Sequence, residues 1–540
     1  MIPLPPHGHP GAAAVPGTPP CEASRGPGAS RLRPLAWAQA LLLLFASSAC
    51  LPRPTANPNV LVVGVASGPN NLDPRIGTDE VSGKAAQLLF NNLMAVGADL
   101  RVVPELAERL DNPEPTIYVA TLRRGVMFHD GHELTSADVV YTFRSLLDPT
   151  FVSPRKGAFR MIKSIDARGR YAVVFTLAEP FGSFPVNLVI PIVPDGAGPS
   201  LADHPIGTGP YRFIRYAVDD HLDLAPFEKY FGGRPKNDGL VLKIVPDDIM
   251  RGLELRKGTI HVVVNSLAPD IVFQLKQDPG LQLVESPGTD YQYIGLNLRD
   301  PILKDVRVRQ ALASAIDRNA IVEHLRRGLA VPAVGMLPRV SWAFEPDVLS
   351  FDYNPPKARA LLDAAGHPDP DGDGPATRFS LSLKMSNAEF NRLQASVIQQ
   401  NLRAVGVALD VRTYEFATLY ADVLKGNFQL FTLQWVGGAV VDPDILRRVF
   451  HSTQVPPAGF NRGYFQNAEV DRLLDEASTA IAEADRRKLY GRVQQIIAEQ
   501  VPYISLWSIT NAVVAARSLA GIHVPPTADF TFLKDVARTN

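Results

Sequence analysis

One stretch of the sequence, residues 379–435, narrows the folds open to this chain more than any other. Within it, the apolar residues follow the spacing of a strand, a helix, a strand, a helix and a strand in turn. Right-handed crossovers make the three strands of such a βαβαβ unit parallel, and ligands of parallel sheets bind outside the carboxyl ends of the strands. The sequence therefore predicts an α/β protein, and Trp435 stands at one of these carboxyl ends, where the third strand ends. The strands are expected at residues 379–385, 407–411 and 428–435. The first intervening helix is expected over 390–402, with a stop at Gly406, and the second, shorter helix is expected to end at Gly426.

Local signals outside this unit predict further elements. A continuous apolar run over residues 60–65 suits a strand buried on both faces, followed by a loop at its carboxyl end. Thr135 and Asp138 have the spacing of a capping box, so a helix is expected to begin there and to continue through Leu147. Further expected elements are a strand over 172–177 and helices over 305–315 and 318–328.

Length and charge exclude some classes of protein. A chain of 540 residues exceeds the size at which one hydrophobic core stops growing, so we expect more than one domain. The formal net charge of −1 offers no basic field for a phosphate backbone. Nucleic acid is therefore not expected as a partner.

The N-terminal residues 1–49 have the order of an export signal: a Pro- and Gly-rich leader, a charged segment, a short apolar run and small residues before Cys50. The end of this segment resembles the bacterial lipoprotein signal, in which such a Cys is lipidated, although Ser47 stands where that signal usually has Leu. We expect lipidation at Cys50, with residues 50–58 as a tether; the alternative is a secreted protein with an idle Cys50. The sequence has only two Cys and processing would remove Cys21, so no intramolecular disulfide is expected in the processed chain.

The sequence carries no G-x-S-x-G, H-E-x-x-H, C-x-x-C or Walker A pattern. Their absence lowers the expectation of catalysis, and we expect a protein that is not an enzyme and has no cofactor and no metal site. His129 and His132 offer two metal ligands without a third at useful spacing, so a polar turn is favoured. The acids of residues 369–374 resemble a calcium loop, but Ser380 replaces the bidentate Glu, and a solvated loop is favoured over a weak calcium site. Residues 207–209 are expected to form a tight turn.

Trp435 has two interpretations. A Trp at the end of a strand is often part of the core. Here Gly437 and Gly438 follow, and they expose backbone amides and allow a ligand to approach closely. The residues alone leave both interpretations open.

Over residues 60–507, ordered motifs resemble the extracytoplasmic solute-binding proteins of the peptide/nickel class (family 5) of ABC transporters. The matching segments are NLDP at 71–74, LRRGVMFHDG at 122–131, LTSADVVY at 134–141, HPIGTGPY at 204–211, YIGLN at 293–297, DVRVRQAL at 305–312, AIDR at 315–318, Trp435 with DPD at 442–444, and VPYISLW at 501–507.

The resemblance implies a bilobal fold of the periplasmic-binding-protein type II-like class, with an extra domain inserted in the first lobe. The solute is expected in the cleft between the lobes, and the lobes are expected to close around it by a hinge motion. The implied first lobe comprises residues 59–285 with 508–540, including an inserted subdomain at about 82–194, and the second α/β lobe comprises 286–507. The implied ligand-binding residues are Ser67, Gly68, Asn70, Trp435, Gly437 and Gly438.

The function implied by the resemblance is capture of a peptide or peptide-like solute and its delivery to a membrane permease, while separate subunits hydrolyse ATP. We expect a monomer, lipid-anchored to a bacterial membrane in the periplasm or at the cell surface. Two alternatives remain: a secreted hydrolase or metalloenzyme that uses His129, His132 and residues 369–373, or a signalling receptor subunit that uses the same cleft.

One departure from the family concerns the ligand's amino terminus. Peptide-binding members place an acid between the Trp and the following Asp-Pro, and this acid pairs with the amino group. Residues 436–441 contain no acid. Either another acid substitutes, or the solute lacks a free amine. Asp442 is expected to stabilise the turn rather than the ligand.

Overall fold

The computed structural model describes residues 59–372, 374–436, 438 and 440–539. The expected leader, Cys50, the tether and Gly437 lie outside the described residues. The main sheet has 11 strands. In spatial order they are β15 (Val407–Tyr414), β14 (Phe379–Ser386), β16 (Leu430–Trp435), β12 (Leu281–Leu296), β17 (Tyr503–Ala516), β11 (Val262–Val264), β1 (Leu61–Val65), β10 (Leu240–Ile244), β9 (His221–Pro226) and β8 (Tyr211–Ala217), while β13 (Ala330–Pro332) pairs with β17 off this path.

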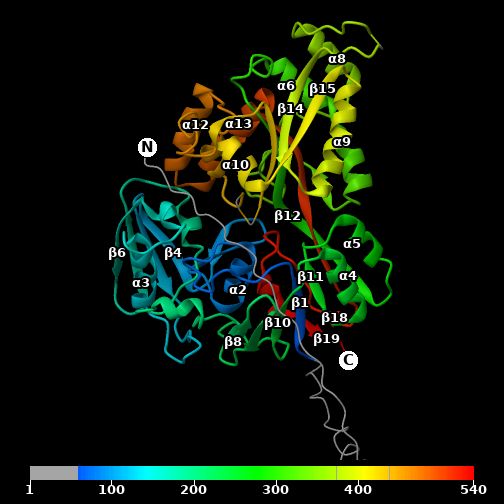
Figure 1. Cartoon of the computed structure of the whole chain (residues 1–540). Coiled ribbons are helices and arrows are strands. Elements are labelled where there is room, and N and C mark those ends of the chain that lie inside the picture. Colours follow the sequence, from blue (N-terminus) through cyan, green and yellow to red (C-terminus); the bar gives the residue numbers. More distant parts are fainter. Residues whose placement is uncertain (1–58, 373, 437, 439, 540) are drawn as a thin grey trace, which may run out of the picture. The chain divides into compact units, whose positions relative to one another are not determined.

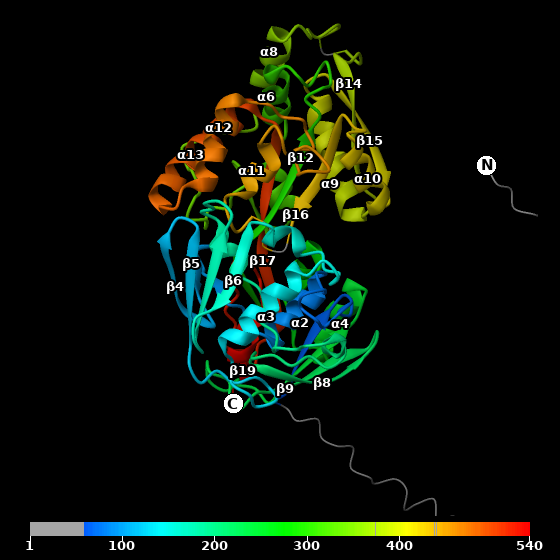
Figure 2. The same cartoon turned by 90° about the vertical axis from the view of Figure 1, so that its left-hand side faces the viewer.

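Two long antiparallel strands, β12 with 16 residues and β17 with 14, run through this whole assembly (Figures 1 and 2). At one end β17 pairs with β11, and at the other end β12 pairs with β16. We call the part built on β1 and β8–β11 the first lobe and the part built on β13–β16 the second lobe. The register of the long pair shifts between Pro287 and Tyr291, opposite Thr510 and Ser508. The shift lies beside the expected lobe limits, which we retain as a proposal.

In the first lobe, the continuous apolar run becomes a central strand, as predicted. Strand β1 pairs in parallel with both β10 and β11, and Leu61 and Val63 are fully buried. Its residues share one hydrophobic cluster with helix α2, and the other side of the sheet packs against helices α4 and α5. The bounds are α2 (Glu80–Leu89), α4 (Asp248–Lys257) and α5 (Pro269–Leu275).

A separate four-stranded sheet, in the order β4-β5-β7-β6, packs with helix α3 around its own hydrophobic cluster. The predicted capping box is confirmed, because both of its hydrogen bonds are present. The side chain of Thr135 accepts from the backbone N–H of Asp138, and the side chain of Asp138 accepts from the backbone N–H of Thr135. The predicted strand over 172–177 is confirmed as β7. The elements of this region are β2 (Met94–Val96), β3 (Val102–Pro104), β4 (Ala107–Glu114), β5 (Ile117–Leu122), α3 (Ser136–Leu147), η1 (Lys156–Phe159), β6 (Ile162–Ala167), β7 (Ala172–Leu177), η2 (Phe184–Leu188) and η3 (Pro199–Ala202).

The predicted βαβαβ unit is confirmed in the second lobe. Strand β14 pairs in parallel with β15 on one side and with β16 on the other. The second helix of the unit ends at Gly426, whose φ of 72° is left-handed and suits a residue without a side chain. The helices and remaining elements are α6 (Val306–Ala315), α7 (Arg318–Ala320), η4 (Ile321–Leu325), α8 (Pro355–Ala364), α9 (Glu389–Arg403), α10 (Phe416–Lys425), α11 (Ile445–Phe450), α12 (Ala468–Thr479), α13 (Glu483–Gln500), β18 (Leu519–Ala520), η5 (Phe530–Asp535) and β19 (Ala537–Arg538).

The prediction of one helix over residues 318–328 is wrong in both the length and the type of the helix. A single α-turn passes into the π-turn η4, which ends at Leu325. The next side chain, Arg326, is buried, and its Nη2 donates to Gln292 Oε1 at 2.6 Å and to Gln394 Oε1 at 3.0 Å. These long-range bonds and the left-handed φ of 80° at Gly328 turn the chain away from a helical course.

Within the described part of the chain, no helix combines the length and the apolar character needed to cross a membrane.

We predict that Gly288→Ala, at the register shift of the long strands, destabilises the fold by about 1–3 kcal/mol. A Cβ at this position would overlap the carbonyl oxygen of Ile509 and would lie 2.9 Å from Asn511 Oδ1. The matched control is Gly157→Ala, because a Cβ there meets no heavy atom within 4 Å. Urea unfolding of the three proteins checks the prediction, and equal losses in both variants would contradict it.

Candidate functional site

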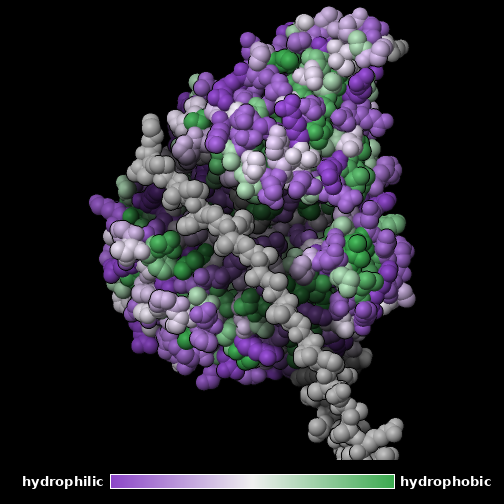
Figure 3. Space-filling model, viewed as in Figure 1, coloured by the Kyte–Doolittle hydropathy of each residue, from purple (hydrophilic) through white to green (hydrophobic). Residues whose placement is uncertain are grey.

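The carboxyl ends of parallel strands mark the candidate site in each lobe. In the second lobe, β14, β15 and β16 run in the same direction and end at Ser386, Tyr414 and Trp435. In the first lobe, β1 and β10 run in the same direction, and the loop at residues 66–70 follows the end of β1. The space-filling view shows the surface hollowed between the two lobes (Figure 3).

The first-lobe group is the loop that contains Ser67, Gly68 and Asn70. Ser67 and Asn70 are exposed, and Gly68 is half-buried. A Cβ at Gly68 would overlap the hydroxyl group of Tyr216, so this tyrosine packs closely on the loop backbone. The loop thus presents two polar side chains on a closely packed backbone.

The second-lobe group begins at Trp435, the last residue of β16. Its ring is half-buried and lies edge-on to Phe460 at 5.2 Å between centroids, so it is partly core and partly surface. The Nε1 atom of Trp435 has no hydrogen-bond partner among the described residues. Val436 is 56% exposed, and Gly438 has a left-handed φ of 77°.

Gly438 also lies close to the first lobe. A Cβ built on it would be 4.0 Å from the Cγ2 atom of Thr527, which follows β17 and β18 in the C-terminal segment. No hydrogen bond between described residues joins the Trp435 segment to the loop at 66–70. Five of the expected ligand-binding residues, Ser67, Gly68, Asn70, Trp435 and Gly438, therefore lie at the predicted strand ends of the two lobes, and their role in binding stays a prediction.

Asp442 links the second lobe to Ser183, next to Phe184 of the hydrophobic cluster under the four-stranded sheet. Its Oδ1 accepts from the backbone N–H of Asp444 at 2.9 Å, which confirms the expected role in the turn. The same atom accepts from Ser183 Oγ at 2.6 Å, and Arg486 lies 3.4 Å from the Asp442 carboxylate. Arg486 Nη1 also donates to the carbonyl of Gly182 at 3.0 Å. Sequence reasoning missed these contacts, because Ser183 and Arg486 are about 300 residues apart and stand in no recognisable motif.

The histidines proposed for a metal site serve other contacts. His129 Nδ1 accepts from the N–H of Gly207 at 3.2 Å, and its Nε2 donates to the carbonyl of Gly209 at 3.0 Å. Burial lowers the pKa of His129 to about 4, so the ring is neutral. His132 instead lies against the carboxylate of Asp130, with Nδ1 and Oδ1 2.6 Å apart. Among the described residues, no group of three or more His, Cys, Asp or Glu is placed to hold a metal ion.

At residues 207–209, where a tight turn is expected, the chain passes close to the end of helix α2. The N–H of Gly209 donates to the carbonyl of Leu89 at 3.0 Å, at the end of α2. A Cβ at either glycine of this segment would overlap the backbone of that helix end.

In the loop expected at 369–374, two acidic side chains contact residues that follow the loop in the chain. Asp371 Oδ2 accepts from the N–H of Ala376 at 2.9 Å, and Asp369 lies 3.5 Å from Arg378. Asp373 lies outside the described residues.

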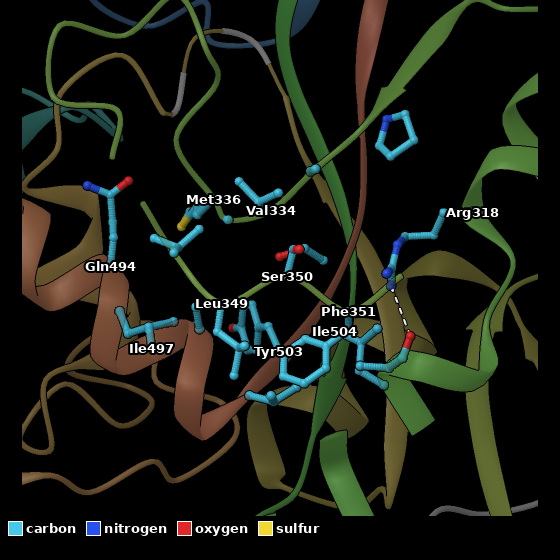
Figure 4. Close-up of a pocket in the computed structure, with 18 of the residues that line it drawn as sticks. Arg318, Val334, Met336, Leu349, Ser350, Phe351, Gln494, Ile497, Tyr503 and Ile504 are labelled. Atoms are coloured by element: carbon cyan, nitrogen blue, oxygen red, sulfur yellow. Dashed lines mark hydrogen bonds between the residues drawn. The ribbon is translucent and has the colours of Figure 1, made fainter. Parts of the chain in front are cut away.

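A cavity of about 290 Å³ lies elsewhere in the second lobe (Figure 4). It is bounded by the segment around residues 334–351, by α13 and by Tyr503 of β17. Arg318, at its edge, donates to the carbonyl of Ala313 at 3.2 Å. The cavity includes neither Trp435 nor the loop at 66–70, and we assign it no function.

Comparisons with known proteins agree with this architecture. A family model described as bacterial extracellular solute-binding proteins, family 5 Middle, matches residues 101–457. The oligopeptide-binding protein AppA of Bacillus subtilis is 30% identical over 490 residues, covering 87% of this chain and 90% of that protein. The structure of AppA in complex with a nonapeptide has a TM-score of 0.72 at 28% identity, covering 89% of this chain and 99% of that chain.

Two further relatives carry other names. The glutathione-binding protein GsiB of Pectobacterium atrosepticum is 31% identical over 491 residues, covering 87% of this chain and 93% of that protein. The structure of NikZ from Campylobacter jejuni in complex with Ni(L-His) has a TM-score of 0.74 at 25% identity, covering 89% of this chain and 100% of that chain.

Asp444, beside the Asp442 contacts, provides a pH-dependent test. Burial, and then the charge of Asp442, raise the pKa of Asp444 to about 7. Between about pH 4 and pH 7 the folded chain therefore holds a proton that the unfolded chain has lost, and this group lowers stability as the pH rises. We predict that the stability of Asp444→Asn relative to wild type increases from pH 4 to pH 7 and then levels off. Chemical unfolding at several pH values measures this difference, and a difference independent of pH would contradict it.

Proposed function

Because the chain belongs to the bacterial extracellular solute-binding proteins of family 5, we propose that it is the substrate-binding subunit of an ABC importer. It captures a peptide or peptide-like solute between its lobes and delivers it to a membrane permease. The printed names of AppA and GsiB, an oligopeptide-binding and a glutathione-binding protein, support this solute class.

The observation that carries the proposal is the position of the strand ends. The loop with Ser67 and Asn70 follows the end of β1 in the first lobe, and Trp435 stands at the end of β16 in the second. The two lobes share the long pair β12 and β17, whose register shifts between Pro287 and Tyr291. A solute held by both groups favours a closed arrangement, whereas a solute that contacts one lobe only shifts no equilibrium.

The ligand-binding set that we propose is Ser67, Gly68, Asn70, Trp435, Gly437 and Gly438. Trp435 and Asn70 are its most testable members, because the first offers a half-buried ring and the second an exposed amide.

We further propose that the protein is a monomer on the outer side of a bacterial membrane, held there by a lipid on Cys50. The order of charged, apolar and small residues before Cys50 supports export and lipidation.

We predict that a peptide solute at 100 times its dissociation constant stabilises the wild-type protein by about 2.7 kcal/mol. Thermal unfolding with a panel of peptides and sugars measures this effect. Trp435→Ala and Asn70→Ala should lose it, whereas Phe231→Ala, which removes an exposed aromatic ring of the first lobe, should keep it. The absence of stabilisation by every solute in the panel would contradict the proposal.

We predict that Cys50→Ser releases the protein from the membrane fraction of expressing bacteria, and that the matched variant Cys21→Ser leaves it there. The reason is that only Cys50 stands directly after the small residues of the signal. Fractionation and mass spectrometry of the N-terminal peptide check both statements. Retention of Cys50→Ser in the membrane would exclude the lipid anchor.

A further inference from the structure

Arg462 is a buried cation without a carboxylate partner. The residue is only 5% exposed. No ion pair between described residues includes it, and its Nε has no hydrogen-bond partner in the described part of the chain. Burying an uncompensated charge is costly, so an arrangement of this kind calls for an explanation.

Among the described residues, the contacts of the guanidinium are with phenol hydroxyls and aromatic rings. Nη1 donates to the hydroxyl of Tyr293 at 3.1 Å, and Nη2 donates to the hydroxyl of Tyr420 at 3.3 Å. The rings of Trp435 and Phe460 each have their centroids 5.2 Å from Cζ. Burial raises the pKa of Tyr293, so this phenol stays protonated and supplies no negative charge. The two hydrogen bonds use two of the five N–H donors of an Arg side chain.

The location of Arg462 agrees with a ligand site. Its ring partner Trp435 ends β16, and its hydrogen-bond partner Tyr420 lies on α10, which begins directly after β15. Tyr420, Trp435 and Phe460 are each half-buried, and Phe416, which stacks on Tyr420, is 57% exposed. The cation therefore lies beneath a partly exposed aromatic rim at the carboxyl end of the parallel strands.

A second unsatisfied donor belongs to the same cluster, because Trp435 Nε1 also has no partner among the described residues. The Nε of Arg462, the Nε1 of Trp435 and the positive charge of the guanidinium lie near the carboxyl end of β16, and this combination suits a planar anion. A carboxylate accepts such donors in the fork geometry of arginine, and the resulting hydrogen bonds are among the strong ones.

We propose that Arg462 binds a carboxylate of the solute, so that the ligand is a peptide-like acid held by its carboxylate end. The inference rests on the proposed function and names the chemistry of that same cleft. It also accounts for the segment 436–441, which has no acid to pair with an amino group. At this end of the site, the charge that the protein offers is positive.

The first test needs no variant. Thermal unfolding of the full chain is measured with a mixture of random tripeptides and with the same mixture made as C-terminal amides. We expect the acids to stabilise the protein and the amides to do so at least tenfold less well in apparent affinity. N-acetylation of the acids should change little. Equal binding of acids and amides would overturn the inference and leave the proposed function intact, whereas binding of neither mixture would overturn both.

The second test separates a binding role from a structural one. Arg462→Met should weaken the binding of the tripeptide acids about 10- to 100-fold and abolish the preference of the protein for acids over amides. Without ligand it should unfold at the same temperature as wild type or higher, because it removes an unpaired buried charge. Arg462→Lys should keep part of the preference.

The matched control is Arg448→Met, which removes an exposed guanidinium that lies 4.6 Å from the same Phe460 ring. It should leave the preference unchanged. If Arg462→Met unfolds at a lower temperature and still prefers acids to amides, Arg462 is structural and the inference is wrong.

Discussion

The antiparallel pairing of β12 with β17 is the interaction on which the rest of the structure depends. Each strand belongs to both lobes, so the two cores are parts of one hydrogen-bonded sheet rather than separate domains joined by a flexible linker. The register of this pairing shifts at two adjacent places, between Pro287 and Tyr291 and between Gln292 and Tyr293. Such an irregularity lets a sheet bend at one place while both ends remain paired.

Buried polar contacts fill the space beside the register shift of this pair. Asn511, which is buried, donates to the carbonyls of Pro525 and Pro526 at 3.1 and 3.0 Å, and accepts from Asn265 Nδ2 at 2.9 Å. Two of these bonds satisfy carbonyl groups of the C-terminal segment, beside the register shift of the long strands. Ser183, near the four-stranded sheet, and Arg486 both contact Asp442 of the second lobe. Other contacts between the lobes are the ion pair of Arg327 with Asp270 at 2.7 Å and the packing of Leu329 against the hydrophobic cluster of α4 and α5.

The sequence predicted those parts of the fold that rest on local patterns. The alternation over 379–385, the helical spacing that follows it and the capping box at Thr135 depend on residues a few positions apart, and they are found as expected. The extent of the sheet was not predicted, because the pairing of β12 with β17 joins segments more than 200 residues apart. The π-turn after Ala320 was also missed, because the hydrogen bond of Arg326 to Gln292 that follows it joins residues 34 positions apart and leaves no local pattern.

The candidate site divides in the same way. The strand ends at Trp435 and after β1 followed from periodicity, and the family resemblance added the loop with Ser67 and Asn70. Arg462 carries no signal in the sequence, because its environment is assembled from β12, α10 and β16. A buried charge without a carboxylate partner can be recognised only when its neighbours in space are known.

The central claim is that two lobes joined by one long strand pair shut around a solute. Small-angle X-ray scattering of the protein, with and without a peptide shown to bind it, tests this claim most directly. The account predicts a smaller radius of gyration in the bound state. Identical scattering curves at saturating ligand would contradict it.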